Sequence, residues 1–112
     1  MTGRGGKVLM VGSGMSRLGD FESGHGCWHP VPIASTVGTV LVNKIPAAQV
    51  GDVTSPHVCP KKPPHIDQIS KGSKTIFLNK RPAARIGDLL KSLGPGGVAV
   101  MAQGSHSVLA GG

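Results

Sequence analysis

The sequence of 112 residues predicts an all-β fold with pseudo-threefold internal repetition. Two observations support this class. A phrase of 14 residues occurs twice, at residues 39–52 and 75–88, with identical residues at eight positions, which indicates an internal repeat. In addition, no apolar pattern of helical period extends over three turns. Short apolar runs are instead separated by Gly, Asn and Pro, which is typical of short strands joined by turns.

Less similar copies of the phrase lie near both ends of the sequence. Residues 47–52 have a counterpart at residues 15–20, which lie 32 positions earlier, and residues 104–109 resemble residues 72–77. The phrase therefore occurs three times and is followed by a fourth opening strand, which predicts the pseudo-threefold symmetry. Variable segments separate the copies, at residues 21–38, 53–74 and 89–106.

Short strands are expected where β-branched or other apolar runs precede turn residues. In chain order, these runs are residues 7–11, 40–42, 76–78 and 98–100. The two central runs are followed by Asn-Lys, which predicts a tight turn because Asn tolerates left-handed backbone angles. Residues 24–30 contain Gly24, Gly26 and Pro30, and we expect them to form a structured loop rather than a helix.

Length and composition indicate one small domain with a thin core. Residues 1–6 are expected to be a flexible N-terminus, and residues 7–112 are expected to form the single domain. Aromatic residues make up 3% of the chain, which also contains 18 Gly and nine Pro, so it lacks the bulky side chains of a deep core. A domain of this kind often needs disulfides, a metal ion or a partner for its stability.

The net charge of +7 raises the question of a nucleic-acid partner. The 12 Lys and Arg residues are scattered, with no basic run longer than two, and almost no aromatic side chains are present to stack on bases. We therefore interpret the charge as a solvated surface and expect no specific nucleic acid as partner. No signal peptide is expected either, because the apolar residues 8–11 are too few for one or for a membrane span.

Histidine and cysteine are concentrated in the variable segments. His25 and His57 each lie five residues after the aspartate of a repeated Gly-Asp turn, and Cys27 and Cys59 each lie seven residues after it. Folding about a pseudo-threefold axis would bring these equivalent positions together. Imidazole and thiolate are preferred zinc ligands, so the spacing is compatible with a metal site. It is equally compatible with a disulfide and surface histidines.

The acidic residues provide little support for an enzyme. Three of the five, Asp20, Asp52 and Asp88, occupy the repeated Gly-Asp turn, which is a structural position. Glu22 and Asp67 remain as candidate general bases for a zinc hydrolase, but neither lies in a known catalytic spacing from the His and Cys residues. We interpret both as loop carboxylates. The other alternative is a small nucleic-acid-binding module stabilised by zinc.

Two segments resemble the Pro-Ala-Ala-Arg signature of the PAAR-repeat family. They are residues 45–52 (Ile-Pro-Ala-Ala-Gln-Val-Gly-Asp) and residues 81–88 (Arg-Pro-Ala-Ala-Arg-Ile-Gly-Asp). Residues 24–26, 57–60 and 72–79 also resemble loops and a strand of this family, so the resemblance covers nearly the whole chain. It implies a small cone of short β-strands with an apex that a metal ion holds together.

The resemblance implies a structural function rather than catalysis. PAAR-repeat proteins cap the trimeric β-helical spike of type VI secretion systems, contractile phage tails and related extracellular injection particles, and they sharpen it for membrane piercing. The implied partners are one spike trimer for each chain, effector or toxin cargo, and a target membrane that is contacted transiently. The implied route is synthesis in the bacterial cytoplasm and delivery at the tip of the machine.

The resemblance also implies one structural Zn²⁺ ion that is bound by three histidines and one cysteine. The best matching positions are His25, His57, Cys59 and His65, with Cys27 and His29 as alternates. Residues 94–97 contain no histidine or cysteine, so the first two repeats would provide every ligand. Docking on the spike would use apolar residues at the base of the cone, for which we select Val8, Leu9, Val40, Val42, Ile76, Leu78, Val108 and Leu109.

Overall fold

The computed structural model describes residues 12–94 and 97–112, and over these residues it consists of short β-strands without a helix, which confirms the all-β class. The strands are β1 (Gly12–Gly14), β2 (Leu41–Val42), β3 (Ile45–Pro46), β4 (His57–Cys59), β5 (Lys62–His65), β6 (Asp67–Ile69), β7 (Phe77–Leu78), β8 (Arg81–Pro82), β9 (Leu89–Ser92), β10 (Val98–Val100) and β11 (Leu109–Gly111). In this described part of the chain, no helix has the length and apolar character needed to cross a membrane. The expected flexible residues 1–6 and strand at residues 7–11 lie outside the described residues.

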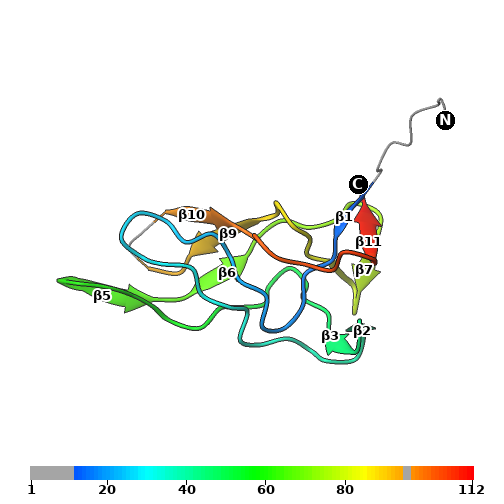
Figure 1. Cartoon of the computed structure of the whole chain (residues 1–112), viewed down its shortest axis with the longest axis horizontal. Coiled ribbons are helices and arrows are strands. Elements are labelled where there is room, and N and C mark those ends of the chain that lie inside the picture. Colours follow the sequence, from blue (N-terminus) through cyan, green and yellow to red (C-terminus); the bar gives the residue numbers. More distant parts are fainter. Residues whose placement is uncertain (1–11, 95–96) are drawn as a thin grey trace.

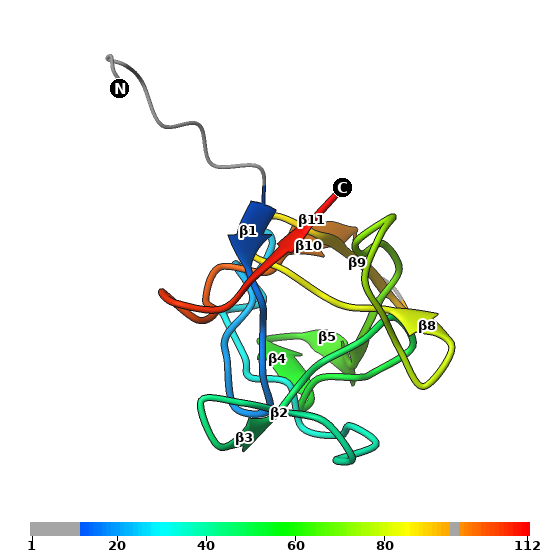
Figure 2. The same ribbon diagram turned by 90° about the vertical axis from the view of Figure 1, so that its right-hand side faces the viewer.

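Three two-stranded antiparallel pairs form one end of the molecule, which we call the base (Figures 1 and 2). The pairs β2–β3 and β7–β8 are hairpins with the turns Asn43-Lys44 and Asn79-Lys80. All four turn residues have a positive φ between 52° and 67°, as a type I′ turn requires. The third pair, β1–β11, consists of two segments that are far apart in the sequence (Figure 2). The predicted third copy is therefore assembled from both ends of the described chain.

Backbone hydrogen bonds between the copies of the repeated phrase form a ring around the pseudo-threefold axis. Ser16 N–H donates to the carbonyl of Ala84, Ala84 N–H to that of Ala48, and Ala48 N–H to that of Ser16, at 2.9 to 3.0 Å. All three residues are completely buried. Large side chains cannot fit where three backbones approach one axis so closely, which explains the Ala-Ala pair of the phrase.

Two apolar clusters fill the interior, and equivalent residues of the three repeats contribute to each. The cluster near the base includes Val42 of β2, Leu78 of β7 and Ala110 of β11. The second cluster includes Ile33, Ile69 and Met101, which are almost completely buried. The pseudo-threefold repetition expected from the sequence thus extends from the backbone to the core.

The aspartate side chains fix the three Gly-Asp turns. Each aspartate accepts a hydrogen bond from the backbone N–H of the residue three positions before it, at 2.7 to 2.9 Å. These pairs are Asp20 with Arg17, Asp52 with Gln49, and Asp88 with Arg85. The structural role expected for these acids is therefore confirmed.

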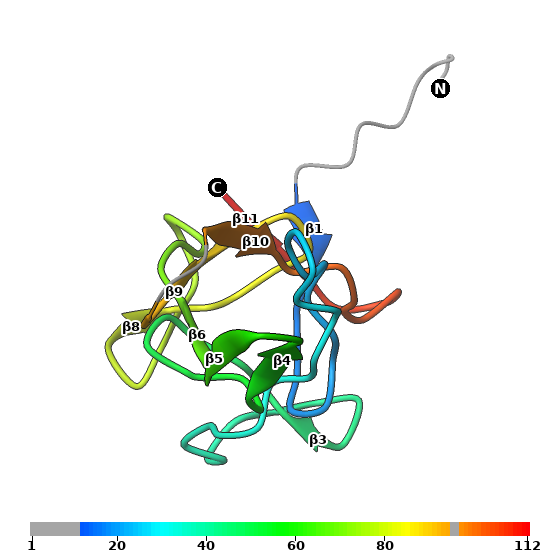
Figure 3. The same ribbon diagram turned by 90° about the vertical axis from the view of Figure 1, so that its left-hand side faces the viewer.

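The end of the molecule opposite the base is called the apex here, and it is formed by the β4–β5 hairpin and residues 21–31 (Figures 1 and 3). The strands β10, β9 and β6 form a three-stranded antiparallel sheet beside this hairpin (Figure 3). Since parts of the first two variable segments build the apex, the histidines and cysteines of these two segments lie in this half of the molecule.

Candidate metal centre

His57 and His65 lie opposite each other at the foot of the β4–β5 hairpin. His57 begins β4, His65 ends β5, and the two residues are register partners. His57 is completely buried and His65 is 7% exposed, so neither is a surface histidine. Their ring centroids are 5.0 Å apart. The hairpin therefore brings two imidazoles side by side inside the apex.

His25 reaches the same place from the first variable segment. It pairs with Trp28 across a two-residue turn, and the turn follows Gly24. A side chain cannot replace the hydrogen of Gly24, because φ is +74° and a Cβ atom would lie 2.7 Å from the carbonyl oxygen of Trp28. The His25 ring lies 5.2 Å from that of His57 and 5.1 Å from that of His65. His25 and His57 thus meet, as their equivalent spacing from the Gly-Asp turns indicated.

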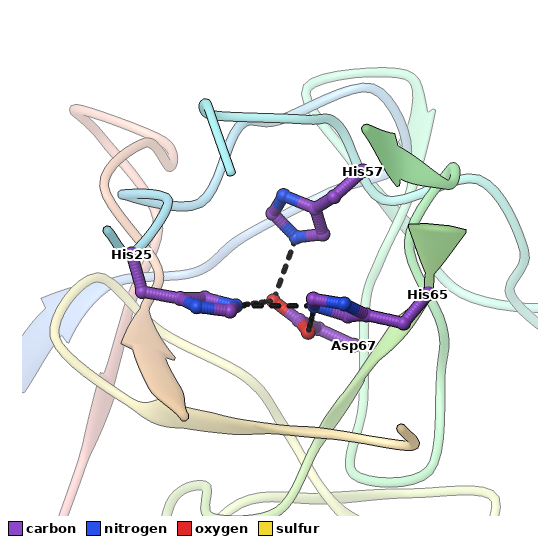
Figure 4. A group of neighbouring side chains, drawn as sticks. All are labelled: His25, His57, His65 and Asp67. Atoms are coloured by element: carbon purple, nitrogen blue, oxygen red, sulfur yellow. Dashed lines mark hydrogen bonds and ion pairs between the residues drawn. The ribbon is translucent and has the colours of Figure 1, made fainter. Parts of the chain in front are cut away.

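Three imidazole nitrogens and one carboxylate converge at the centre of this group (Figure 4). Nε2 of His25 lies 3.2 Å from Nε2 of His65. Asp67, the first residue of β6, places Oδ2 2.8 Å from His57 Nε2 and Oδ1 3.2 Å from His65 Nε2. One donor atom from each of these four residues lies within 4.8 Å of the others. We call His25, His57, His65 and Asp67 the histidine–aspartate cluster.

The donors of this cluster fit a metal ion. The carbonyl of His29 accepts a hydrogen bond from His57 Nδ1 at 2.8 Å, and this bond fixes the ring with Nε2 beside Asp67, where Nε2 can bind a metal ion once it has released any proton of its own. A hydrogen bond at the outer nitrogen is the usual way of orienting a histidine that binds a metal. Imidazole and carboxylate together are common ligands of Zn²⁺ and other divalent transition metal ions.

A second buried carboxylate, that of Glu22, adjoins the cluster. It is completely buried, and its Oε2 lies 3.1 Å from His57 Nε2. Its Oε1 accepts backbone hydrogen bonds from Gly24 at 2.7 Å and from Val31 at 3.3 Å. Burial raises the pKa of Glu22 to about 7, and a hydrogen bond with Asp67 adds to the increase. Without a metal ion, Glu22 is therefore still mostly protonated between about pH 5 and 7, where an ordinary glutamate has already lost its proton.

The pKa values of Asp67 and His65 shift in the direction that suits a metal ligand. Burial alone would raise the pKa of Asp67, but hydrogen bonds with Glu22 and His57 outweigh burial and lower it. Burial lowers the pKa of His65; Asp67 opposes this change, whereas the neighbouring His57 and His25 strengthen it. Asp67 is therefore ionised and His65 neutral over a wide pH range, and these are the protonation states that bind metals.

The two cysteines are bonded to each other in the structure. Cys27 and Cys59 form a disulfide with Cα atoms 5.4 Å apart, which links the first variable segment to β4. The sulfur of Cys59 is thus bonded to Cys27, and Asp67 is the fourth member of the cluster. The side chain of His29 is exposed, and only its carbonyl contributes to the cluster.

Sequence reasoning considered Glu22 and Asp67 only as general bases and then as loop carboxylates. Their position in the sequence contains the information that could have placed them in the site. They are the two acids outside the Gly-Asp turns, and each is close to a predicted ligand. Glu22 lies three residues before His25, and Asp67 lies two residues after His65.

The eight residues selected for docking fall into different parts of the molecule. Val8 and Leu9 lie outside the described residues. Val42 and Leu78 are 3% and 8% exposed, so they belong to the core and are not available for docking. The remaining residues, which are partly buried or exposed, are Val40, Ile76, Val108 and Leu109. Alternation along the strands explains why Val42 and Leu78 are buried, and the same alternation turns the residue before each of them outward.

Comparison with protein-family models matches residues 23–92 to the PAAR motif family. The matched segment contains both copies of the 14-residue phrase and the whole histidine–aspartate cluster. None of the curated proteins that were compared matches the chain. The PAAR family comprises structural spike-tip proteins of contractile injection systems, which assemble at the tips of secretion machines or phage tails, and it is a metal-binding family rather than an enzyme family. Because the match covers more than half of the sequence, this chain belongs to the PAAR motif family.

Proposed function

We propose that the chain caps the trimeric β-helical spike of a contractile injection machine with its base and sharpens the spike for membrane piercing with its apex. The main support is a set of exposed apolar side chains, one on each strand pair of the base. We call Leu41 of β2, Phe77 of β7 and Leu109 of β11 the base triad. Each occupies the equivalent register position, opposite Pro46, Pro82 and Gly14 respectively.

The base triad suits a partner with threefold symmetry. Leu41, Phe77 and Leu109 are 59%, 57% and 39% exposed. A single chain can offer the same contact to every subunit of a trimer only if its own structure repeats three times, as the three strand pairs of the base do (Figure 2). Burial of these side chains on docking would favour association through the hydrophobic effect. The expected stoichiometry is therefore one chain for each spike trimer.

A structural Zn²⁺ ion at the apex is part of the same proposal. His25, His57 and His65 would bind it, and these residues come from residues 21–31, β4 and β5. The ion would provide a cross-link between these segments and hence a rigid point in a chain with a thin core. Zinc is the ion of choice because it has a strong preference for imidazole nitrogen.

We also propose where the protein is made, assembled and used. The chain would be made in the bacterial cytoplasm and assembled at the tip of a phage tail or a secretion spike. It would contact the target membrane transiently during delivery, with effector or toxin cargo as a further partner.

Docking is tested by mixing the full chain with a trimeric β-helical spike protein of a contractile injection system. Size-exclusion chromatography with light scattering is expected to give one chain for each trimer. Phe77→Asp puts a charge into the base triad and is expected to weaken binding about tenfold or more, because the charge would be buried without a partner. Val98→Asp is the matched control, since Val98 is equally exposed but lies on β10, outside the base.

Two results would contradict the docking proposal. One is the binding of three chains to each trimer, because separate chains would then occupy the three equivalent subunit surfaces. The other is an equal loss of affinity in both variants, because docking would then not depend on the base triad.

A further inference from the structure

The apex contains two buried carboxylates without a fixed positive charge beside them. Glu22 and Asp67 are completely buried. Within residues 12–94 and 97–112, their charged partners closer than 4.0 Å are the histidines of the cluster, and neither acid pairs with Lys or Arg. Burial of an ionised carboxylate is strongly unfavourable unless a cation or hydrogen bonds compensate for the lost water.

A divalent cation would balance this charge. When a divalent ion displaces the protons that these side chains hold, three imidazoles and two carboxylates have a net charge of about −2, which the ion neutralises. The geometry directs both acids to the same nitrogen, since Asp67 Oδ2 lies 2.8 Å and Glu22 Oε2 3.1 Å from His57 Nε2. The outer nitrogen of His57 is already used by the carbonyl of His29. His57 Nε2 and both carboxylates thus face one point.

Sulfur is not needed to complete this set of donors. The cluster brings four donor atoms within 4.8 Å of one another, and all of them are nitrogen or oxygen. The sulfur of Cys59, which the spacing of the sequence made a candidate ligand, is bonded to Cys27. A disulfide sulfur is a poor metal ligand compared with a thiolate.

We propose that the apex binds its metal ion with nitrogen and oxygen atoms alone, with Asp67 as the fourth ligand in place of Cys59 and Glu22 as a second carboxylate that balances the charge of the ion. The presence of an ion rests on the proposed function, and the ligand assignment goes beyond it. Binding of the ion is then independent of whether the cysteines are oxidised or reduced. A tip that is made in a reducing cytoplasm and used outside it would keep its ion in both environments.

Equilibrium binding of Zn²⁺ to the full chain, measured by competition with a chromophoric chelator, tests the assignment. Asp67→Asn and Glu22→Gln are each expected to lower the affinity about 10- to 100-fold. The combined Cys27→Ser/Cys59→Ser variant is expected to bind like the oxidised wild type, and so is the wild type after reduction. Asp52→Asn is the matched carboxylate control, because Asp52 is also buried but lies at a Gly-Asp turn outside the cluster.

Cobalt provides a second readout that requires no substitution. A bond between Co²⁺ and a thiolate produces a strong charge-transfer band in the near ultraviolet, which a site made of nitrogen and oxygen lacks. The reduced wild type loaded with Co²⁺ is expected to show no such band. This measurement decides the question even if one of the variants fails to fold.

The outcomes separate the ligand assignment from the presence of the metal. A thiolate band in the reduced wild type, or loss of zinc in the cysteine variant together with full binding by Asp67→Asn, would overturn the assignment and leave a metal site in place. Failure of the wild type to bind any divalent ion would overturn the metal itself. Docking to the spike is measured separately and depends on the other end of the molecule.

Discussion

Removal of the Cys27–Cys59 disulfide is predicted to lower the free energy of unfolding by about 3 to 4 kcal/mol. The bond joins residues with a sequence separation of 32. The chain-entropy relation for a loop of this length gives about 3.7 kcal/mol at 25 °C. Small domains have a total stability of only about 5 to 15 kcal/mol, so one bond would provide a large part of it in this chain.

The combined Cys27→Ser/Cys59→Ser variant removes the bond without leaving a free thiol. Urea unfolding can be followed by the fluorescence of Trp28, the single tryptophan, which is buried and lies 4.8 Å from the ring of His65. We expect the same difference in stability in the presence of a chelator and in saturating zinc, because the assigned metal ligands are unchanged by the substitutions. Reduced wild-type chain should behave like the variant.

Two results would refute this reasoning. A difference below about 1 kcal/mol would mean that the loop is already restricted in the unfolded chain, so that the bond constrains little. A difference that becomes several kcal/mol larger in zinc would mean that the cysteines bind the ion, since the variant would then lose the stabilisation that ligand binding adds.

Three further predictions concern the core, the turns and the buried acid. Leu78→Ala should lower the free energy of unfolding by about 2 to 4 kcal/mol in urea titrations, whereas Leu41→Ala on the exposed side should change it by less than about 0.5 kcal/mol. Asp88→Ala should lower it by about 1 to 2 kcal/mol, because the backbone N–H of Arg85 loses its acceptor. Burial raises the pKa of Glu22 from 4.5 to about 7, so the folded metal-free chain retains a proton that the unfolded chain has released. The contribution of Glu22 to stability should therefore fall by about 1 to 3 kcal/mol as the pH rises from 4.5 to 7, measured as the change in the difference between the wild type and Glu22→Gln in urea titrations.

The repetitive part of the fold could be predicted because local chemistry recurs in the sequence. The Asn-Lys turns require left-handed backbone angles wherever they occur, and the Gly-Asp turns carry their own hydrogen-bond acceptor. Equivalent spacing from those turns was sufficient to predict that His25 and His57 lie close together. These features depend on a few neighbouring residues and on symmetry, so they can be predicted from one sequence without its relatives.

The composition of the site could not be predicted in the same way, because it departs from the symmetry. Glu22 and Asp67 do not hold equivalent positions, and they meet only after residues 21–31 pack against β6. The pairing of the cysteines likewise depended on whether a loop residue and the last residue of β4 approach within bonding distance. On the base, a shift of one residue along a strand exchanges the buried face for the exposed one, so Val42 was selected where Leu41 is exposed.

The pairing of β1 with β11 has a consequence for the synthesis of the protein. Gly12 lies opposite Gly111, so this pair closes a loop that contains almost all of the described residues. The other two strand pairs of the base, β2–β3 and β7–β8, are hairpins of neighbouring residues and can form as soon as their turns leave the ribosome. We expect the third to wait until residues 109–111 have emerged, and closure of long loops is slow because of its entropy. Until then, the nascent chain would expose an unpaired strand edge and an incomplete core, which makes the interval before β11 emerges the period in which this domain is most prone to aggregate.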